Sequence, residues 1–406
     1  MSQTCIIIGA SHAAAQLAPS LRQEGWEGKI IVLGDEAYLP YHRPPLSKDF
    51  MANDKSAEEL LIRPQTAYDK FNIEFKLGVR AETINRDHKT VTLESGEVLN
   101  YDKLAICTGS RVRTVSLPGV ELDGIHYLRD IADVEGIKED VAPGKSAVIV
   151  GGGYIGLETA AALRKQGMQV TILEMAPRVL ARVTAPEISE FYTRVHTDEG
   201  VIIKTGIAVA GFEGDKHVER VICADGSQFD ADLVVIGVGI VPNIELAEAA
   251  GLEIENGIVV DEYARTNDPD IVSAGDCTYH PNSIYGIRLR LESVPNASDQ
   301  AKSAAASICG KDKLYSSLPW FWSDQYDLKL QIAGLSQGYD QLVVRGDKDR
   351  GRNFTAFYLK EGKLISADCV NSPQEFMVSK RLILAGKVLD PAKLADTEVA
   401  PKDLLV

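Results

Sequence analysis

Two segments of the chain share one pattern of hydrophobic and polar positions. In the later segment, an apolar run at 147–150 leads into a glycine turn, an alanine-rich helical run occupies 159–163, and a second apolar run at 169–173 ends in Glu174. Short apolar runs that alternate with helical runs are typical of buried parallel strands joined by helices. The pattern predicts a strand–turn–helix–strand unit.

The turn of this unit has the spacing of a dinucleotide-binding fingerprint, with glycines at Gly151, Gly153 and Gly156. The first glycine permits the tight turn, the second lets the backbone approach a pyrophosphate, and the third lets the helix pack on the strand. The helix N-terminus offers free N–H groups to the phosphates. Because Glu174 can accept from a ribose 2′-OH and would repel a 2′-phosphate, the pattern favours NAD over NADP.

Two arginines close downstream leave this preference open. Arg178 and Arg182 follow Glu174 and have the charge to bind a 2′-phosphate. They fit equally well as solvated surface arginines.

The earlier segment repeats the pattern in a degenerate form. An apolar strand at 4–8, a helix at 15–23 and a strand at 30–33 enclose Gly9, Ser11 and Ala14, and the acids Asp35 and Glu36 follow. Serine replaces the second glycine of the fingerprint and alanine the third, and alanine is tolerated there. An N-terminal unit of this kind is where flavoproteins hold the adenosine half of FAD. The two units form an internal repeat on the scale of a domain.

The remaining pattern predicts further elements and several candidate site positions. The proline-rich loop at 38–48 carries Arg43 and Lys48, which suits either an anion anchor or an ordered surface loop. Asp276 follows a strand of small residues, as either a ligand or a helix N-cap. We predict helices at 57–71 and 292–309, strands at 73–78, 91–93, 101–106 and 231–236, and a third domain with strands at 328–332, 341–345 and 353–359 and a helix at 372–385.

Composition limits the class of protein. With 406 residues, 45% of them hydrophobic and 25% charged, the chain is too long for one core, and two or three domains are expected. The net charge of −15 disfavours binding to nucleic acid or to an anionic membrane. No apolar run approaches the roughly 20 residues of a membrane helix.

The cysteines, the histidines and the first residues carry little further chemistry. The first five residues lack a basic start, so no signal peptide is expected. Six cysteines are scattered without a CxxC pair, which argues against a zinc site, a disulfide framework or a dithiol active site and fits a reducing cytoplasm. Seven histidines show no clustering, and we predict no metal.

Five motifs in order, at 40–48, 151–158, 275–276, 292–297 and 319–326, cover essentially the whole chain. Together they resemble the FAD- and NADH-dependent ferredoxin reductases of bacterial cytochrome P450 and ring-hydroxylating oxygenase systems. Relatives of that family include rubredoxin reductases and apoptosis-inducing factor. The chain departs from the family at Ser11, where glycine is usual.

The resemblance implies an α/β fold like that of glutathione reductase, with two dinucleotide-binding Rossmann-type domains and a C-terminal α+β domain. The implied FAD domain is split into 1–112 and 240–318. The implied NAD domain is 113–239, and the C-terminal domain is 319–406.

The resemblance also places both cofactors. Lys48 and Glu158 resemble a Lys–Glu pair near the flavin N5, with a supporting catalytic role, and Asp276 would accept from the ribityl chain. The implied FAD contacts are Gly9, Ser11, His12, Ala13, Asp35, Arg43, Lys48, Ala81, Thr108, Gly109, Arg129, Asp276, Val294 and Trp322. With the fingerprint residues Gly151 and Gly156, the implied NAD contacts are Gly153, Tyr154, Ile155, Glu158, Glu174, Arg182 and Gly239.

The implied reaction passes a hydride from NADH to FAD and then single electrons to a [2Fe-2S] ferredoxin. Disulfide-reducing relatives carry a cysteine after the first unit, where this chain has Tyr41, His42 and Arg43, so a one-electron protein acceptor is favoured. A rubredoxin reductase, an NADH oxidase and a redox-responsive binding protein similar to apoptosis-inducing factor are the alternatives. We expect a monomer or weak dimer.

Ferredoxins are usually acidic, and so is this chain, so docking needs a local basic patch. Ordinary solvated charges are the alternative interpretation of its candidates. These candidates are Arg288, Arg290, Lys302, Lys311 and Lys313.

Overall fold

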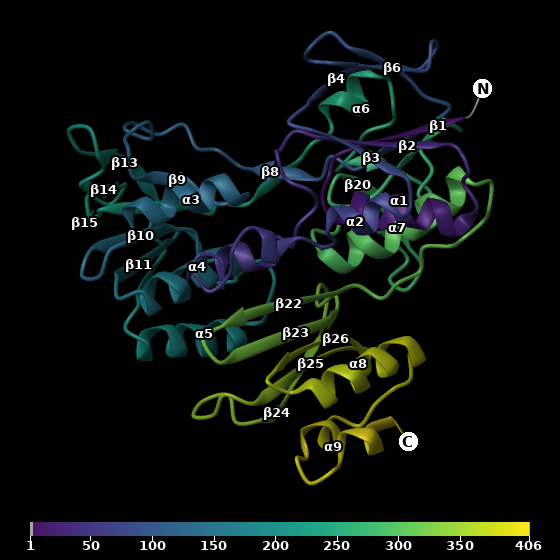
Figure 1. Ribbon diagram of the computed structural model, residues 1–406. Helices are drawn as coiled ribbons and strands as arrows, with labels where there is room; N and C mark the ends of the chain where they lie inside the picture. The colour runs from purple at the N-terminus through teal and green to yellow at the C-terminus, as the bar shows by residue number, and fades with distance from the viewer. Residues whose placement is uncertain (1–2, 406) are drawn as a thin grey trace. The chain divides into compact units, whose positions relative to one another are not determined.

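The computed structural model describes residues 3–405 and divides into two compact units, which are described one at a time. The first unit comprises the chain up to residue 42 together with residues 60–111 and 241–319. The second unit comprises residues 43–59, residues 112–240 and the chain from residue 320 onward. Figure 1 labels the helices and strands in chain order.

A five-stranded parallel sheet with strand order β19-β7-β1-β2-β3 forms the centre of the first unit. Its middle strand pairs Cys5 with Ile30 on one side and with Lys103 on the other. Helices α1 and α7 pack on each other, and their buried alanines let the two backbones approach closely. The bounds are β1 Thr4–Ile8, β2 Lys29–Gly34, β3 Ile73–Leu77, β7 Lys103–Ile106, β19 Ile271–Ser273, α1 His12–Glu24 and α7 Val294–Ile308.

Two small three-stranded sheets and two short helices complete the first unit. The sheet orders are β4-β5-β6 and β18-β20-β21. Their bounds are β4 Ala81–Asn85, β5 Thr90–Leu93, β6 Val98–Asn100, β18 Ile258–Val259, β20 Thr278–Asn282 and β21 Ile287–Leu289, and the helices are α2 Gln65–Asp69 and α6 Glu245–Ala249. The chain passes from one unit to the other five times, and three of these passages fall within the short elements η2 Glu58–Leu60, β8 Ser110–Val112 and β17 Ile240–Pro242.

A second five-stranded parallel sheet, with order β12-β11-β10-β16-β9, lies in the second unit. Its central strands are buried apolar runs, as expected of a parallel sheet covered on both faces. An antiparallel sheet, β13-β14-β15, is formed by the segment between β12 and β16. The bounds are β9 Ile125–Tyr127, β10 Ser146–Val150, β11 Gln169–Glu174, β12 Ile202–Thr205, β13 Val209–Glu213, β14 Arg220–Cys223, β15 Gln228–Asp230, β16 Leu233–Ile236, η1 Pro44–Ser47, α3 Ile131–Asp140, α4 Tyr154–Lys165 and α5 Pro186–Asp198.

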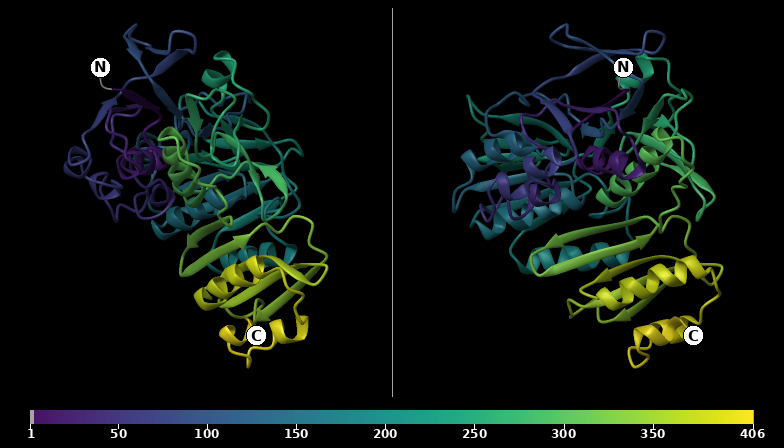
Figure 2. Two further views of the ribbon diagram at one scale, coloured as in Figure 1. Left: turned by 90° about the vertical axis from the view of Figure 1, so that its right-hand side faces the viewer. Right: turned by 45° about the vertical axis from the view of Figure 1, so that its right-hand side comes forward.

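The C-terminal part of the second unit is an antiparallel sheet with order β22-β23-β26-β25-β24. Helix α8 lies along one face of this sheet, against β26 and β23, as Figure 2 shows in yellow. The bounds are β22 Trp320–Gln325, β23 Leu328–Gly334, β24 Gln341–Gly346, β25 Phe354–Lys360, β26 Lys363–Val370, α8 Pro373–Ala385, α9 Pro391–Ala395 and η3 Pro401–Leu405.

The predicted α/β class is confirmed, with two parallel Rossmann-type sheets and a C-terminal α+β part. One predicted helix is wrong, because residues 57–71 form only the short elements η2 and α2. Pro64 separates them with an extended ψ of 158°, and its ring prevents a continuous helix. The predicted domain boundaries at 112/113, 239/240 and 318/319 stay a prediction.

Candidate dinucleotide-binding and redox site

The glycine turn between β10 and α4 is dictated by close backbone contacts. A Cβ on Gly151 would lie 2.3 Å from the Gly237 carbonyl oxygen, and Gly151 has φ of +113°. A Cβ on Gly156 would lie 2.1 Å from the Gly151 oxygen. Gly153 differs, because no atom of the described chain lies within 4 Å of the Cβ position there. The turn is therefore tight on its inner side and open at its middle glycine.

The open side of this turn is the N-terminus of α4, a helix of 12 residues. Among the described residues no side chain caps it, and its first turn holds no acid. The first N–H groups of a helix have no partner within the helix, so they are available to an anion. Ile155 is 45% exposed beside them. These residues fit the pyrophosphate of a dinucleotide.

Glu174 and Arg182 lie along the same edge of the sheet as the turn. The two oxygens of Glu174 accept from the backbone N–H groups of Gly152 and Ala176, each at 2.6 Å, so the carboxylate is fixed next to the glycine turn. A Cβ on Gly239 would lie 3.8 Å from Arg182 Nη2, which places these two predicted contacts side by side. The predicted NAD residues thus come together within the second unit.

The two candidate phosphate-binding arginines differ. Arg178 donates to Ser189 Oγ at 2.6 Å and to the Ala181 oxygen at 3.0 Å, and these bonds hold its own loop together. Arg182 forms no hydrogen bond or ion pair with any residue in the range 3–405. Of the two, Arg182 is the one available to a ligand.

Lys48 and Glu158 form a buried ion pair in the second unit. Lys48 follows the 3-10 turn η1, and its Nζ lies 2.6 Å from Glu158 Oε2. Ser47 Oγ donates to the same oxygen at 2.6 Å, and Ser323 Oγ donates to Oε1 at 2.5 Å. The Glu158 carboxylate, 3% exposed, therefore receives three donors from two different segments. Three donors stabilise the charged carboxylate at this buried position.

Sequence reasoning missed Ser47 and Ser323. Ser47 adjoins Lys48 in the proline-rich loop, so its position was a usable signal. Ser323 lies more than a hundred residues from Glu158 and carries no local signal of its role. Only the pairing of α4 with β22 brings these two residues together.

Further buried hydrogen bonds continue from Ser323. Gln325 Nε2 donates to Ser323 Oγ at 3.1 Å, and Gln325 Oε1 lies 2.8 Å from His196 Nε2. On the other side of the ring, Tyr326 Oη lies 3.3 Å from His196 Nδ1. Burial lowers the pKa of His196 from 6.5 to about 4. The imidazole is therefore neutral at physiological pH.

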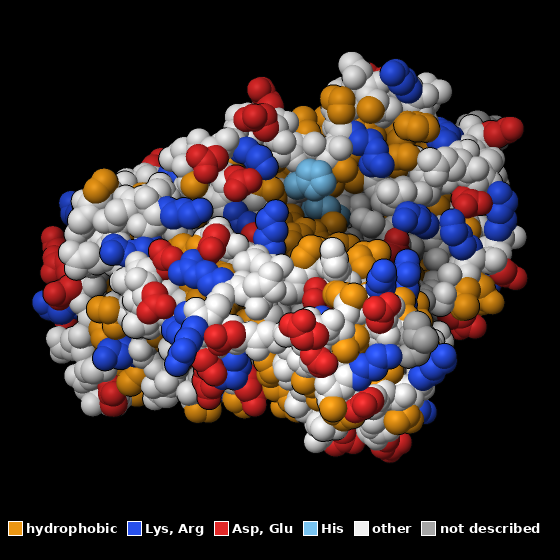
Figure 3. All heavy atoms as spheres, turned by 90° about the horizontal axis from the view of Figure 1, so that it is seen from below, with side chains coloured by type: hydrophobic (Ala, Val, Ile, Leu, Met, Phe, Trp, Pro, Cys, Tyr) orange, Lys and Arg blue, Asp and Glu red, His pale blue; other side chains and the backbone are white. Residues whose placement is uncertain are grey.

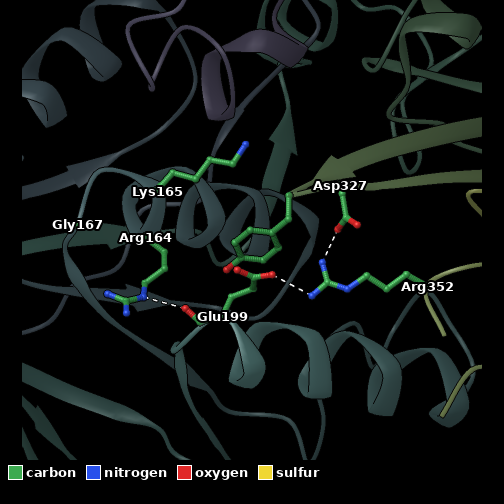
Figure 4. A pocket seen from close by; sticks show the side chains of 7 residues that line it. Arg164, Lys165, Gly167, Glu199, Asp327 and Arg352 are labelled. Atoms are coloured by element: carbon green, nitrogen blue, oxygen red, sulfur yellow. Dashed lines mark hydrogen bonds and ion pairs between the residues drawn. The ribbon is translucent and has the colours of Figure 1, made fainter. Parts of the chain in front are cut away.

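Tyr326 also lines a pocket of about 540 Å³ in the second unit. Figure 4 shows the charged side chains around it. Arg352 bridges Glu199, at 2.9 Å, and Asp327, while Arg164 Nε donates to the Glu199 backbone oxygen at 2.9 Å. The other lining residues are Lys165 and Gly167. Both arginines are therefore engaged by the protein itself.

In the first unit, Ser11 lies at the N-cap of α1 with φ of −124°. Any residue adopts this backbone conformation, so serine replaces the usual glycine without strain. No side chain of residues 3–405 caps this 13-residue helix, and its first turn holds no acid. The N-terminus of α1, like that of α4, therefore fits a pyrophosphate.

The carboxyl ends of β7 and β19 carry further predicted FAD contacts. Thr108 Oγ1 donates to the Asn243 oxygen at 2.7 Å, and Asn243 N donates to the Gly109 oxygen at 2.9 Å. Ser110 Oγ donates to Asp276 Oδ2 at 2.9 Å. The element after Asp276 is strand β20, so the alternative of a helix N-cap at Asp276 is wrong.

The other predicted FAD contacts are divided between the two units. In the second unit, Arg43 Nη1 donates to the Arg129 oxygen at 2.8 Å, and the Trp322 ring lies 5.4 Å from that of Trp320. In the first unit, Gly9 follows β1, His12 and Ala13 begin α1, Asp35 follows β2, Ala81 begins β4 and Val294 begins α7. Their roles as FAD contacts stay predictions.

The predicted basic patch is paired with acids. Arg290 lies 2.5 Å from Glu292, and Lys302 lies 2.8 Å from Asp299. Lys311 and Lys313 both pair with Glu24, and Arg288 donates to the Val260 oxygen at 2.7 Å. Charges of both signs are also interspersed over the face seen in Figure 3. The position of a docking patch stays a prediction.

No helix within residues 3–405 is long and apolar enough to cross a membrane. The same range holds no group of three or more His, Cys, Asp and Glu side chains arranged to bind a metal ion.

Two family models together match most of the chain. The pyridine nucleotide-disulphide oxidoreductase model matches residues 3–301, and a reductase C-terminal model matches residues 320–405.

Relatives match along nearly the whole length. The chain is 42% identical to putidaredoxin reductase from Pseudomonas putida, over 98% of this chain and 96% of that protein. It is 43% identical to a probable ferredoxin reductase from Castellaniella defragrans, over 100% and 99%. A crystal structure of a covalent putidaredoxin reductase–putidaredoxin complex matches with a TM-score of 0.96 and 42% identity, over 99% and 98% of the two chains. The chain therefore belongs to the pyridine nucleotide-disulphide oxidoreductase family.

Proposed function

We propose that the chain is an NADH-dependent ferredoxin reductase. It takes a hydride from NADH with the help of bound FAD and passes single electrons to a [2Fe-2S] ferredoxin, which feeds a cytochrome P450 or another oxygenase. Bound FAD supplies both the hydride acceptor and the one-electron donor. The observation that carries the proposal is the buried Lys48–Glu158 pair, whose Glu158 lies on the helix that begins at an open dinucleotide turn.

The NAD site follows from the residues around β10 and α4. The N–H groups at the start of α4 bind the pyrophosphate, and the open space at Gly153 lets it approach. Glu174 is fixed by two backbone donors and retains acceptor capacity for a ribose hydroxyl. Arg182 lies at the same edge of the sheet and modulates the preference for NADH over NADPH.

The Lys48–Glu158 pair serves the flavin ring. With FAD bound, Lys48 would supply a positive charge to the negatively charged reduced ring, and Glu158 holds that ammonium in position. Glu158 lies in the first turns of α4, so the pair is attached to the same element that binds the NADH pyrophosphate. The start of α1, with Gly9 and Ser11, binds the pyrophosphate of FAD.

The cysteines support a one-electron acceptor rather than a disulfide. Burial raises the pKa of all six thiols, so none is poised as a thiolate nucleophile. The loop at 41–43, where disulfide-reducing relatives carry a cysteine, holds none. The names of two relatives, putidaredoxin reductase and a probable ferredoxin reductase, support a ferredoxin as the acceptor. We place the protein in the cytoplasm as a monomer or weak dimer.

An anaerobic titration with NADH, and separately with NADPH, tests the first half-reaction. We expect stoichiometric bleaching of the flavin absorbance by NADH and a much weaker response to NADPH. A protein that purifies without flavin contradicts the proposal.

A panel of acceptors tests the second half-reaction. With NADH as donor, we expect a [2Fe-2S] ferredoxin to be reduced much faster than a rubredoxin, with little consumption of O₂. Faster reduction of rubredoxin makes the protein a rubredoxin reductase, and rapid O₂ consumption makes it an oxidase. Slow turnover with every acceptor, with a change of oligomeric state on reduction, favours a redox-responsive binding protein.

A further inference from the structure

A continuous line of buried side chains connects the Lys48–Glu158 pair to the pocket beside Tyr326. In order from the pair, these side chains are Ser323, Gln325 and His196. Ser323 and His196 are fully buried, and Gln325 is 1% exposed. Successive polar atoms are 2.5, 3.1, 2.8 and 3.3 Å apart between Glu158 and Tyr326. We call these three side chains the Glu158 chain.

The hydrogen bonds of the Glu158 chain all run in one direction. Gln325 Oε1 can only accept, so Nε2–H of the neutral His196 ring donates to it. Nδ1 then carries no proton and accepts from the Tyr326 hydroxyl. The Gln325 amide nitrogen then donates to Ser323 Oγ. The Ser323 hydroxyl, with its acceptor position used, donates to Glu158. Each member therefore accepts from the member behind it and donates toward the carboxylate.

This direction suits a hydrogen-bond acceptor such as an ionised carboxylate. An ionised carboxylate accepts hydrogen bonds and donates none, and donors that are themselves polarised by a bond behind them are stronger. A chain of neutral groups stabilises the negative charge without adding a competing positive charge near Lys48. The low pKa of His196 keeps the ring neutral, so it adds no such charge.

We propose that Ser323, Gln325 and His196 are positioning residues that hold the Glu158 carboxylate against Lys48, and that Tyr326 donates to His196 Nδ1 at the far end. This inference rests on the proposed function, because it assigns the Glu158 chain a task in flavin reduction. Apolar side chains of similar volume would fill the same space without needing hydrogen-bond partners. The Glu158 chain joins α5 to β22, and Tyr326 directly follows β22, so polar side chains that satisfy one another here have a purpose beyond filling a core.

A matched pair of variants at Ser323 tests the proposal. S323T and S323V have nearly the same shape and differ in one hydroxyl, so any crowding at this fully buried position affects both. We expect NADH to reduce the flavin of S323V about tenfold more slowly than that of S323T.

A second pair at His196 tests the remote end of the Glu158 chain. The amide nitrogen of H196Q can replace the Nε2–H donor, whereas H196L cannot. We expect NADH to reduce the flavin of H196L more slowly than that of H196Q, just as it reduces S323V more slowly than S323T. Equal rates of flavin reduction within both pairs would overturn the proposal.

The tautomer of His196 gives a readout that does not depend on activity. In protein labelled with ¹⁵N-histidine, long-range ¹H–¹⁵N spectra at pH 7 should show the His196 ring neutral with the proton on Nε2. Y326F should leave the proton on Nε2, because Gln325 Oε1 still accepts there. A charged His196 ring, or a proton on Nδ1, would contradict the inferred direction of the hydrogen bonds in the Glu158 chain. If wild-type protein fails to reduce ferredoxin but both variant pairs behave as expected in flavin reduction, the proposed function fails and this inference stands.

Discussion

Lys48 Nζ and Glu158 Oε2 are 2.6 Å apart, and the Glu158 side chain is only 2% exposed. Lys48 belongs to the short stretch 43–59, which joins the second unit rather than the first, and this ion pair attaches the stretch to α4. A buried ion pair is weak support for stability, because desolvation offsets the attraction. The position of Glu158 on the helix that begins at the dinucleotide turn is better explained by a role of the ion pair in the reaction.

Removing either charge alone should cost more than removing both. K48M leaves Glu158 buried with no opposite charge, so we expect about 3–5 kcal/mol of lost stability, measured as the urea unfolding midpoint. The double variant K48M/E158Q should recover much of that loss. Both proteins should reduce their flavin with NADH much more slowly than the wild type does. A K48M protein that is reduced at the normal rate contradicts the role of the pair.

Cofactor preference should depend on Glu174 and Arg182 in opposite ways. E174S removes the charge that repels a 2′-phosphate, so kcat/KM for NADPH relative to NADH should rise about tenfold. R182A removes the unpaired guanidinium at the same sheet edge, so that ratio should fall. R178A is the control, since its side chain is engaged by Ser189 and Ala181. An effect of R178A as large as that of R182A contradicts the assignment.

The sequence predicted the parts of the site that are local and periodic. The turn at Gly151, the acid Glu174 and the loop with Lys48 could be found because spacing and residue type carry their chemistry within a few positions. Ser323 and His196 could not be found, because their roles depend on the packing of β22 and α5 in the second unit. A serine in a strand and a histidine in a helix look the same whether or not they serve a site.

The fold shows the same division between local and distant signals. Strands such as β10 and β16 are continuous apolar runs and were predicted from pattern alone. Strand β26 was missed although it is the middle strand of the C-terminal sheet. It alternates buried and half-buried positions at its start and contains the buried polar residues Ser366 and Asp368, so its sequence does not look like a central strand.

The stability of the protein should fall at mildly acidic pH because of His196. Burial lowers its pKa from 6.5 to about 4, so the unfolded chain binds a proton that the folded protein does not. Stability is therefore fully present above about pH 6.5 and is lost as the pH falls through 4, by about 3 kcal/mol from this one group. H196Q should lack this component, while His280, whose pKa burial also lowers to about 4, contributes equally to both proteins. Urea unfolding midpoints at pH 5 and pH 7.5 measure the difference, and identical pH dependence in the two proteins contradicts the prediction.

Asp368 should give the stability of the protein the opposite dependence on pH. Burial raises its pKa from 3.8 to about 7, although Tyr358 donates to it at 2.5 Å. The folded protein therefore binds a proton that the unfolded chain releases, and stability is lost as the pH rises from about 4 through 7. D368N keeps an acceptor for Tyr358 and cannot ionise, so above pH 7 it should be more stable than wild type by up to about 4 kcal/mol. The two proteins should converge below about pH 4 in urea unfolding, where Asp368 is protonated in both the folded and the unfolded chain. A constant difference between wild type and D368N from pH 5 to pH 8 would show that Asp368 keeps one protonation state throughout.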